Sequence, residues 1–187
     1  MNETTPQLRT GQLLVAKPLL GDLNFDRTVI LLTEHSPAGS VGLVLNRKGD
    51  YKFDQLSADF PFIDLPLYFG GPVEQDHLFF LHTKPDLIPE SVAVKDNIAW
   101  GGSLESLKEM HQMNLIGPQD VRFFLGYSGW GAGQLESEIQ SDSWLIADAS
   151  QLDIFNTPPE EMWTELIKRQ GGEYRLWAHA PADPNLN

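Results

Sequence analysis

A serine in a glycine-rich segment is the first residue whose type and position could do chemistry. Ser128 lies in FFLGYSGWGAGQLESE, after an apolar, strand-like run and before a short acidic segment typical of a helix. A nucleophile elbow has this context, but its GxSxG pattern requires glycine where Trp130 stands. A catalytic serine also needs a base and an orienting acid, and no spacing assigns these roles to His179 and Asp148. We therefore expect the Ser128 hydroxyl to hydrogen-bond loop backbone.

The same segment holds four glycines within eight positions: Gly126, Gly129, Gly131 and Gly133. Glycine adopts backbone angles closed to other residues, so this spacing predicts a tightly specified loop that another molecule approaches. A phosphate site is disfavoured, because neither GxGxxG nor a Walker pattern is present and Glu136 replaces the third glycine. Glu136 and Glu138 would also repel an anion from the start of the following helix, which we expect them to stabilise.

The remaining ionisable residues form no diagnostic motif. The five histidines include no HExxH spacing, and His77 and His82 lie an odd number apart on a predicted strand, so they point to opposite faces. Paired carboxylates need burial to shift a pKa before they can do acid–base work, and in a chain this acidic a solvated face is the default. We therefore expect no metal and no cofactor.

Three further side chains leave two interpretations open. Trp130 could fold back on the core or wall a pocket. Arg27 and Arg47 interrupt the acidic background of the first predicted hairpin, where ordinary surface ion pairs explain them as well as ligand binding does. The choice depends on whether the fold brings these residues to one cavity.

The composition limits the class of protein. We expect a single domain over residues 1–187 with short irregular tails at both ends, because this length suits one core. The 26 acidic and 13 basic residues give a formal charge of −13, which disfavours direct binding to nucleic acid or anionic lipid. No cysteine, signal core or membrane span is present, so we expect a soluble, cytoplasmic protein without disulfides.

Strands must position most of these residues. Short β-branched and leucine-rich runs between Gly, Pro and Asn clusters predict strands at 12–17, 27–33, 40–46, 67–69, 77–82, 92–99, 121–127, 143–148 and 173–179. The second and third look like a hairpin whose connection, EHSPAGS, suits a loop longer than the tightest turn.

Three helices are expected between and after the strands. Ser103 can cap the first, a second short helix begins near Gly133, and Thr157 with Glu160 has capping-box spacing for the last, with Pro158 at its first position. The last helix carries an apolar stripe of Met162, Trp163, Leu166 and Ile167. Helices inserted irregularly among neighbouring strands predict an α+β fold with a mixed, largely antiparallel sheet.

Five segments together resemble the YqgE/AlgH family, also called UPF0301 or DUF179. They are GQLLVAKPLLGDLNFDRTVILLTEH, GSVGLVLNR, YFGGPV, FLH and FFLGYSGWGAGQLESEI, in this order and spacing, and the likeness runs from about Gly11 to at least Trp144. The tail, with WAHAPADPNLN, looks like the branch found in Bacteroidetes-type bacteria. The resemblance implies a strongly bent, bifurcated sheet that forms a pseudo-barrel with helices packed around it.

The resemblance also implies a set of recurrent positions. In this chain they are Asn24, Phe25, Arg27, Asn46, Arg47, Gly70, Gly71, Pro72, Gly126, Gly129, Trp130, Gly131, Gly133, Gln134, Leu135 and Glu136. Two departures matter: relatives often carry arginine and glycine where His77 and Leu78 stand, and the family pattern accepts alanine in place of Ser128. If alanine serves there, nucleophilic catalysis by serine is not the shared activity.

The resulting hypothesis is a cytoplasmic bacterial protein that binds a ligand or partner and is not an enzyme. Most of the family is uncharacterised, and one branch is named as a transcriptional regulator of alginate production; the charge of this chain makes any such regulation indirect, through a protein partner or small ligand. The predicted binding residues are Arg27, Asn46, Arg47, Gly129, Trp130, Gly131, Gln134 and Glu136. The alternative hypothesis is a small-molecule hydrolase using Ser128 or Glu136. A third is that the glycines serve only the bends of the sheet.

Overall fold

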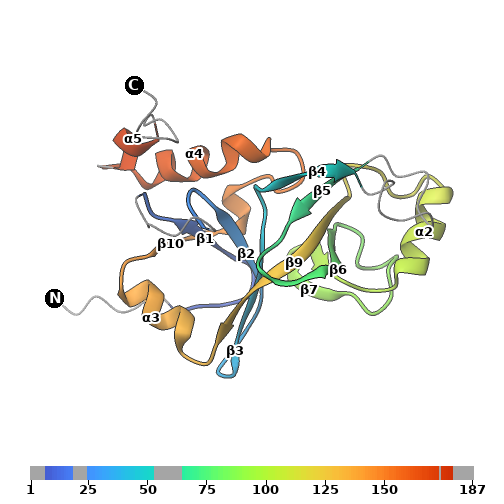
Figure 1. Ribbon diagram of the computed structural model, residues 1–187. Helices are drawn as coiled ribbons and strands as arrows, with labels where there is room; N and C mark the ends of the chain where they lie inside the picture. The colour runs from blue at the N-terminus through green and yellow to red at the C-terminus, as the bar shows by residue number, and fades with distance from the viewer. Residues whose placement is uncertain (1–6, 19–24, 53–64, 173, 179–187) are drawn as a thin grey trace.

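The computed structural model describes residues 7–18, 25–52, 65–172 and 174–178 (Figure 1). The strands are β1 (Gln12–Ala16), β2 (Val29–Ser36), β3 (Gly39–Val44), β4 (Lys48–Lys52), β5 (Pro66–Phe69), β6 (Val73–His82), β7 (Val92–Lys95), β8 (Ile98–Trp100), β9 (Val121–Gly131) and β10 (Trp144–Asp148). The helices are α2 (Leu104–Gln112), α3 (Gln134–Gln140), α4 (Pro159–Gln170) and α5 (Tyr174–Trp177), with a 3-10 turn η1 at Ala149–Gln151.

One ten-stranded sheet organises the described residues, and β9 is its central strand. The strand order is β10-β1-β2-β3-β9-β6-β8-β7, with β4 and β5 off this path. The first half of β9 pairs antiparallel with β6 and parallel with β5, whereas its end, from Ser128 to Gly131, pairs antiparallel with β3. The sheet therefore divides at β9, and it bends without closing into a barrel. The predicted α+β fold with a bent, mostly antiparallel sheet is confirmed.

Both faces of the β1–β2–β3 part of the sheet are covered. Leu13 and Leu31 pack with Trp163 and Leu166 of α4, whereas the neighbouring Leu14 packs on the other side. That other side carries Leu135 of α3 together with Trp130 and Trp144. Figure 1 shows α4 and α3 on opposite sides of β1 and β10, as the alternation of side chains along a strand requires. A third cluster joins α2 to β6 and β9 through Leu107, Phe80 and Phe123.

The glycine-rich segment is a strand, so the predicted loop is wrong. β9 continues to Gly131, and Gly129 and Gly131 pair with Val41 and Gly39 of β3. Of the four glycines, Gly126 and Gly133 have positive φ, at 67° and 72°. Gly126 marks the bend where β9 passes from one set of partners to the other, and Gly133 precedes α3.

Several local expectations also need correction. The β2–β3 hairpin is confirmed, but Ser36 pairs directly with Gly39, so its turn has two residues rather than a longer loop. The strand expected at 92–99 is a hairpin of β7 and β8 that turns at Asp96, whose φ is +49°. The strand expected at 173–179 is wrong, because Tyr174–Trp177 is helical; residues 173 and 179 lie outside the described part of the chain.

The helices follow the expected positions more closely. Ser103 caps α2, its hydroxyl accepting from the Ser106 N–H at 3.2 Å. α3 begins just after Gly133, as expected. The capping box predicted for α4 is absent: Pro158 is the N-cap without a side-chain bond, and Pro159 occupies the first helical position. The apolar stripe of that helix is buried as predicted.

Candidate functional site

A hollow of about 830 Å³ lies at the tip of the β2–β3 hairpin. Residues 33–36 and 38–41 of the hairpin form one side, residues 92–94 of β7 another, and Tyr127, Gly129 and Trp130 of β9 contribute with Thr10 and Val73. Glu34 is the one carboxylate among these lining residues, and they include no lysine or arginine. The hollow, called here the hairpin hollow, is lined by apolar and polar side chains and carries one carboxylate.

Two unpaired strand edges border the hairpin hollow. The pairing of β1 with β2 extends along β2 from Val29 to Leu31. The last backbone hydrogen bond between these segments runs from the Gly11 N–H to the Leu32 carbonyl at 2.9 Å. β7 is paired only with β8 in the described sheet. Thr33 to Ser36 of β2 and Val92 and Ala93 of β7 therefore border the hollow with edges that no described strand occupies, whereas the Val94 carbonyl lies against Gly11.

His35 links the hairpin tip to α3. Because Ser36 and Gly39 flank the two-residue turn, the next pair, His35 and Ser40, does not exchange backbone hydrogen bonds, and its side chains lie close on one face. The His35 Nδ1 is 2.8 Å from the Ser40 Oγ, and its Nε2 is 4.0 Å from a carboxylate oxygen of Glu136. His35 also lines a second hollow of about 480 Å³ with Pro37, Glu136 and Ile139.

Trp130 is a core residue that also borders the hairpin hollow. The residue is only 7% exposed, and its side chain packs in the cluster under α3. The indole N–H donates to Glu138 at 2.9 Å, and the Trp144 indole donates to the same carboxylate oxygen at 2.8 Å. Gln134 donates to the other Glu138 oxygen and accepts from the Gly131 N–H at 3.1 Å. Glu138 thus ties α3 to the sheet, a role that its position in the sequence did not indicate.

The predicted residues of the first hairpin lie in a separate group. Asn46 accepts from the Val29 N–H at 2.9 Å and donates to the Arg27 carbonyl at 2.8 Å. Arg47 donates to the Asp26 carbonyl at 3.2 Å, and the Arg27 guanidinium lies 4.8 Å from the centre of the Trp163 ring. None of Arg27, Asn46 and Arg47 lines either hollow. They stand at the open end of the hairpin, whereas the hollows stand at its tip; Asn24 lies outside the described residues.

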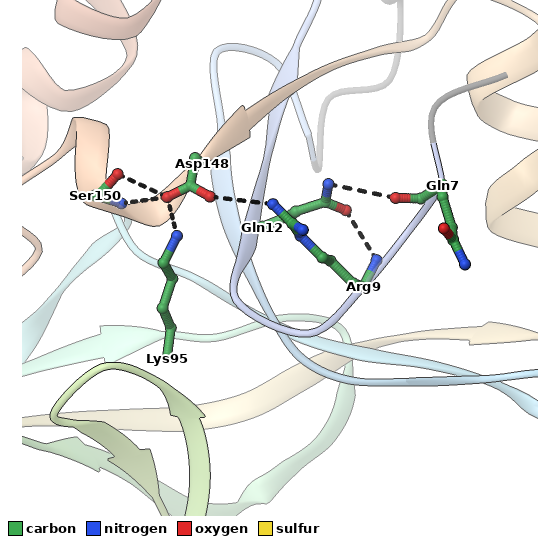
Figure 2. Close-up of polar contacts among 6 residues, drawn as sticks. All are labelled: Gln7, Arg9, Gln12, Lys95, Asp148 and Ser150. Atoms are coloured by element: carbon green, nitrogen blue, oxygen red, sulfur yellow. Dashed lines mark hydrogen bonds and ion pairs between the residues drawn. The ribbon is translucent and has the colours of Figure 1, made fainter. Parts of the chain in front are cut away.

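Ser128 has the structural role that the sequence predicts, a hydrogen bond to backbone. Its side chain is fully buried, and its hydroxyl donates to the Gly70 carbonyl at 3.3 Å. Asp148, the acid considered with it, instead accepts from Lys95 and from both the N–H and the hydroxyl of Ser150, with Arg9 at 3.5 Å (Figure 2). These bonds, that of Lys95 first, hold the pKa of Asp148 below its ordinary range. His179 lies outside the described residues.

His77 and His82 differ as expected for opposite faces. The side chain of His77 is 63% exposed beside Asp76, whereas His82 is fully buried. Burial lowers the pKa of His82, whose Nδ1 accepts from the Lys84 N–H at 3.2 Å. Within the described residues, no group of three metal-ligating side chains is close enough to hold an ion. None of the described helices is long and apolar enough to cross a membrane.

Comparison with known proteins identifies the family, because a family model described as AlgH-like matches residues 13–175. The chain belongs to the AlgH-like family. Among curated relatives of this AlgH-like chain, a UPF0301 protein of Chlorobium limicola is 44% identical over 97% of each sequence. A UPF0301 protein of Cytophaga hutchinsonii is 40% identical over 96% of this chain and 100% of its own length. These sources agree with the bacterial branch that the tail indicated.

Solved structures of similar fold cover nearly the whole AlgH-like chain. AlgH of Pseudomonas aeruginosa, determined in solution, has a TM-score of 0.72 and 31% identity, and the match covers 97% of this chain and 98% of AlgH. The crystal structure of DIP2367 from Corynebacterium diphtheriae has a TM-score of 0.77 over 95% of each chain. Its identity is 23%, so that likeness concerns the fold alone.

The residues that the sequence missed in this AlgH-like chain are those of the hairpin tip and of β7. His35 was assigned to the connection and Ser40 to the start of the next strand, and a two-residue turn would have placed them opposite each other. Val92 to Val94 carry no local signal of a site, because they border the hollow only through the bend of the sheet.

Proposed function

We propose that this AlgH-like protein works by binding and not by catalysis, with its ligand or partner held in the hairpin hollow. The observation that carries the proposal is the hollow itself, in which side chains from β2, β3, β7 and β9 combine apolar contact with a few polar groups, as ligand pockets commonly do. Val41, Val73 and Val94 supply apolar contact, and Glu34 and His35 supply polar groups. Gly129 keeps one wall free of side chain.

Any regulatory role of this protein would act through the ligand or partner that it binds. The chain has 26 acidic and 13 basic residues, and the hollow adds a carboxylate without a cationic neighbour in its lining. Phosphate backbones are repelled by such a surface. We therefore place any effect on transcription downstream of a protein or small ligand.

A substitution that fills the hollow tests the proposal. Val41→Trp adds a large side chain at a half-buried position of the lining, and Leu176→Trp adds the same side chain at a position 77% exposed on α5. A library of metabolites and short peptides is screened by native mass spectrometry against all three proteins. We expect ligands that bind the wild type and Leu176→Trp but not Val41→Trp. A folded Val41→Trp protein that retains every ligand would refute the site.

One observation favours hydrolysis as a second candidate function. Ser40, His35 and Glu136 form a hydroxyl–imidazole–carboxylate series, with 2.8 Å and 4.0 Å between successive groups. Ser40 is only 5% exposed, which limits access to its hydroxyl. A fluorophosphonate probe separates the candidates: labelling that Ser40→Ala abolishes and Ser128→Ala preserves would show a nucleophilic Ser40 and favour hydrolysis, and absence of labelling would count against it.

A further inference from the structure

The edges of the hairpin hollow indicate the class of its occupant. A strand edge exposes a row of backbone N–H and C=O groups, and proteins normally protect such edges with charges, proline or a covering segment. Val92 and Ala93 of β7 are exposed, Val92 to 47%, and the first charged residue of this strand, Lys95, is engaged by Asp148. The register of β7 on β8 shifts between Ala93 and Lys95, so the regular edge is short.

The facing edge of β2 offers the same kind of groups. His35 is opposite Ser40 in a pair that does not exchange backbone bonds, so its N–H and C=O point away from β3. Beyond Leu32 no described strand pairs on that side. Thr33 to Ser36 and Val92 to Ala93 are thus two short edges beside one hollow.

We infer that the occupant is an extended peptide segment of a partner protein, which adds as a strand to the free edge of β7 and carries a basic side chain toward Glu34. The inference rests on the proposed function, because it names the ligand of the same hollow. Three or four residues of extended peptide, about 10–13 Å, match the free edges. Alternate apolar side chains would contact Val41 and Val94, and charge complementarity with Glu34 selects lysine or arginine.

The test selects a random heptapeptide library on the intact protein, with Val41→Trp for counter-selection. Enriched peptides should alternate apolar residues and contain lysine or arginine. In a synthetic copy of the enriched sequence, N-methylation of one alternate set of amides should weaken binding at least tenfold, and methylation of the other set much less. Hydrogen exchange at the amides of His35 and Ala93 should slow on binding.

Substitutions in the protein test the same peptide contact. Ala93→Lys puts a protective charge on the exposed edge and should weaken the basic peptide at least tenfold. Met113→Lys adds the same charge at a position 63% exposed beyond α2 and should leave binding unchanged. Glu34→Gln should weaken basic peptides about three- to tenfold.

The outcomes separate the inference from the proposed function. Ligands that need an open hollow but tolerate every N-methylation, or that are never peptides, would overturn strand addition and leave the binding function standing. Peptide displacement of a dimer that Ala93→Lys also dissociates would identify a second copy as occupant and overturn the inference. No ligand of any class in the hollow would overturn both.

Discussion

The Glu138 side chain joins α3 to two buried tryptophans. Its carboxylate accepts from two indoles, those of Trp130 and Trp144, and from the Gln134 amide. Both tryptophans are less than a tenth exposed, so neither indole N–H has water as an easy substitute. From the sequence we expect Glu138 to stabilise the start of α3. It is the fifth residue of this helix and instead binds the two indoles.

Removing this acceptor should therefore be costly. Glu138→Ala leaves two buried donors unsatisfied, and we expect the free energy of unfolding to fall by about 2–4 kcal/mol. Glu138→Gln keeps an acceptor oxygen and should cost less. Urea denaturation followed by tryptophan fluorescence measures both. Glu136→Ala, on the same helix and with a side chain 40% exposed, should cost under about 1 kcal/mol. Equal losses for Glu136→Ala and Glu138→Ala would contradict this account.

At the scale of elements, the bend of β9 depends on one glycine. Gly126 has a φ of 67°, and a Cβ there would lie 2.5 Å from the Gly71 carbonyl oxygen. Gly131 has no positive φ, and its Cβ would meet only a Gln134 side-chain atom at 4.0 Å. The two glycines belong to the same strand but tolerate a side chain very differently.

This contrast gives a matched pair of variants. Gly126→Ala combines an unfavourable backbone region with a backbone clash and should lower the free energy of unfolding by about 2–4 kcal/mol. Gly131→Ala should change it by less than about 0.5 kcal/mol. Thermal unfolding monitored by circular dichroism provides the comparison. A Gly126→Ala protein as stable as Gly131→Ala would show that β9 does not need this bend.

Asp148 connects two elements far apart in the strand order, because it accepts from Lys95 at the end of β7 (Figure 2). Its pKa is lowered in the folded state, so the carboxylate stabilises the fold above the unfolded pKa of about 3.9 and loses this effect as pH falls below it. We expect Asp148→Asn to cost about 1 kcal/mol at pH 7, with the difference from wild type shrinking below pH ~4. Urea titrations at several pH values measure it. Asp86→Asn, which removes a carboxylate at an exposed position, is the control variant.

Local sequence could predict most elements but not the glycine strand. Alternation and turn residues located the hairpin and the buried stripe of α4, because those signals depend on neighbours in the chain. The 128–131 segment, beyond the strand predicted at 121–127, becomes a strand because β3 pairs with it, and this tertiary contact overrides the low strand propensity of glycine. Tyr174–Trp177 is a single helical turn whose apolar residues also suit a strand.

At the scale of the whole molecule, the charge predicts what the protein does not bind. With a formal charge of −13, we expect no binding of a 30-base-pair duplex tighter than about 10⁻⁴ M at 0.15 M salt. Fluorescence anisotropy with labelled DNA tests this. Tighter, salt-dependent binding would show that the basic residues gather on one face, and regulation could then be direct.

The candidate site could be predicted only in part, for a reason of topology. Gly129 and Trp130 were predicted and do line the hairpin hollow, but Arg27, Asn46 and Arg47 stand at the other end of the hairpin. The hollow is completed by residues 92–94, which the bent sheet brings opposite β2. Such a site has no signature in any one segment, since bending the sheet is what creates it.

The central strand has a consequence for synthesis on the ribosome. β9 bonds to β3, β5 and β6, all of which precede it in the chain, so the second edge of β3 stays unpaired until β9 has been synthesised. Until that strand leaves the exit tunnel, the nascent hairpins have nothing to join them, and their edges are exposed to other chains. We expect this protein to acquire its tertiary structure late in translation, after β9 has been synthesised.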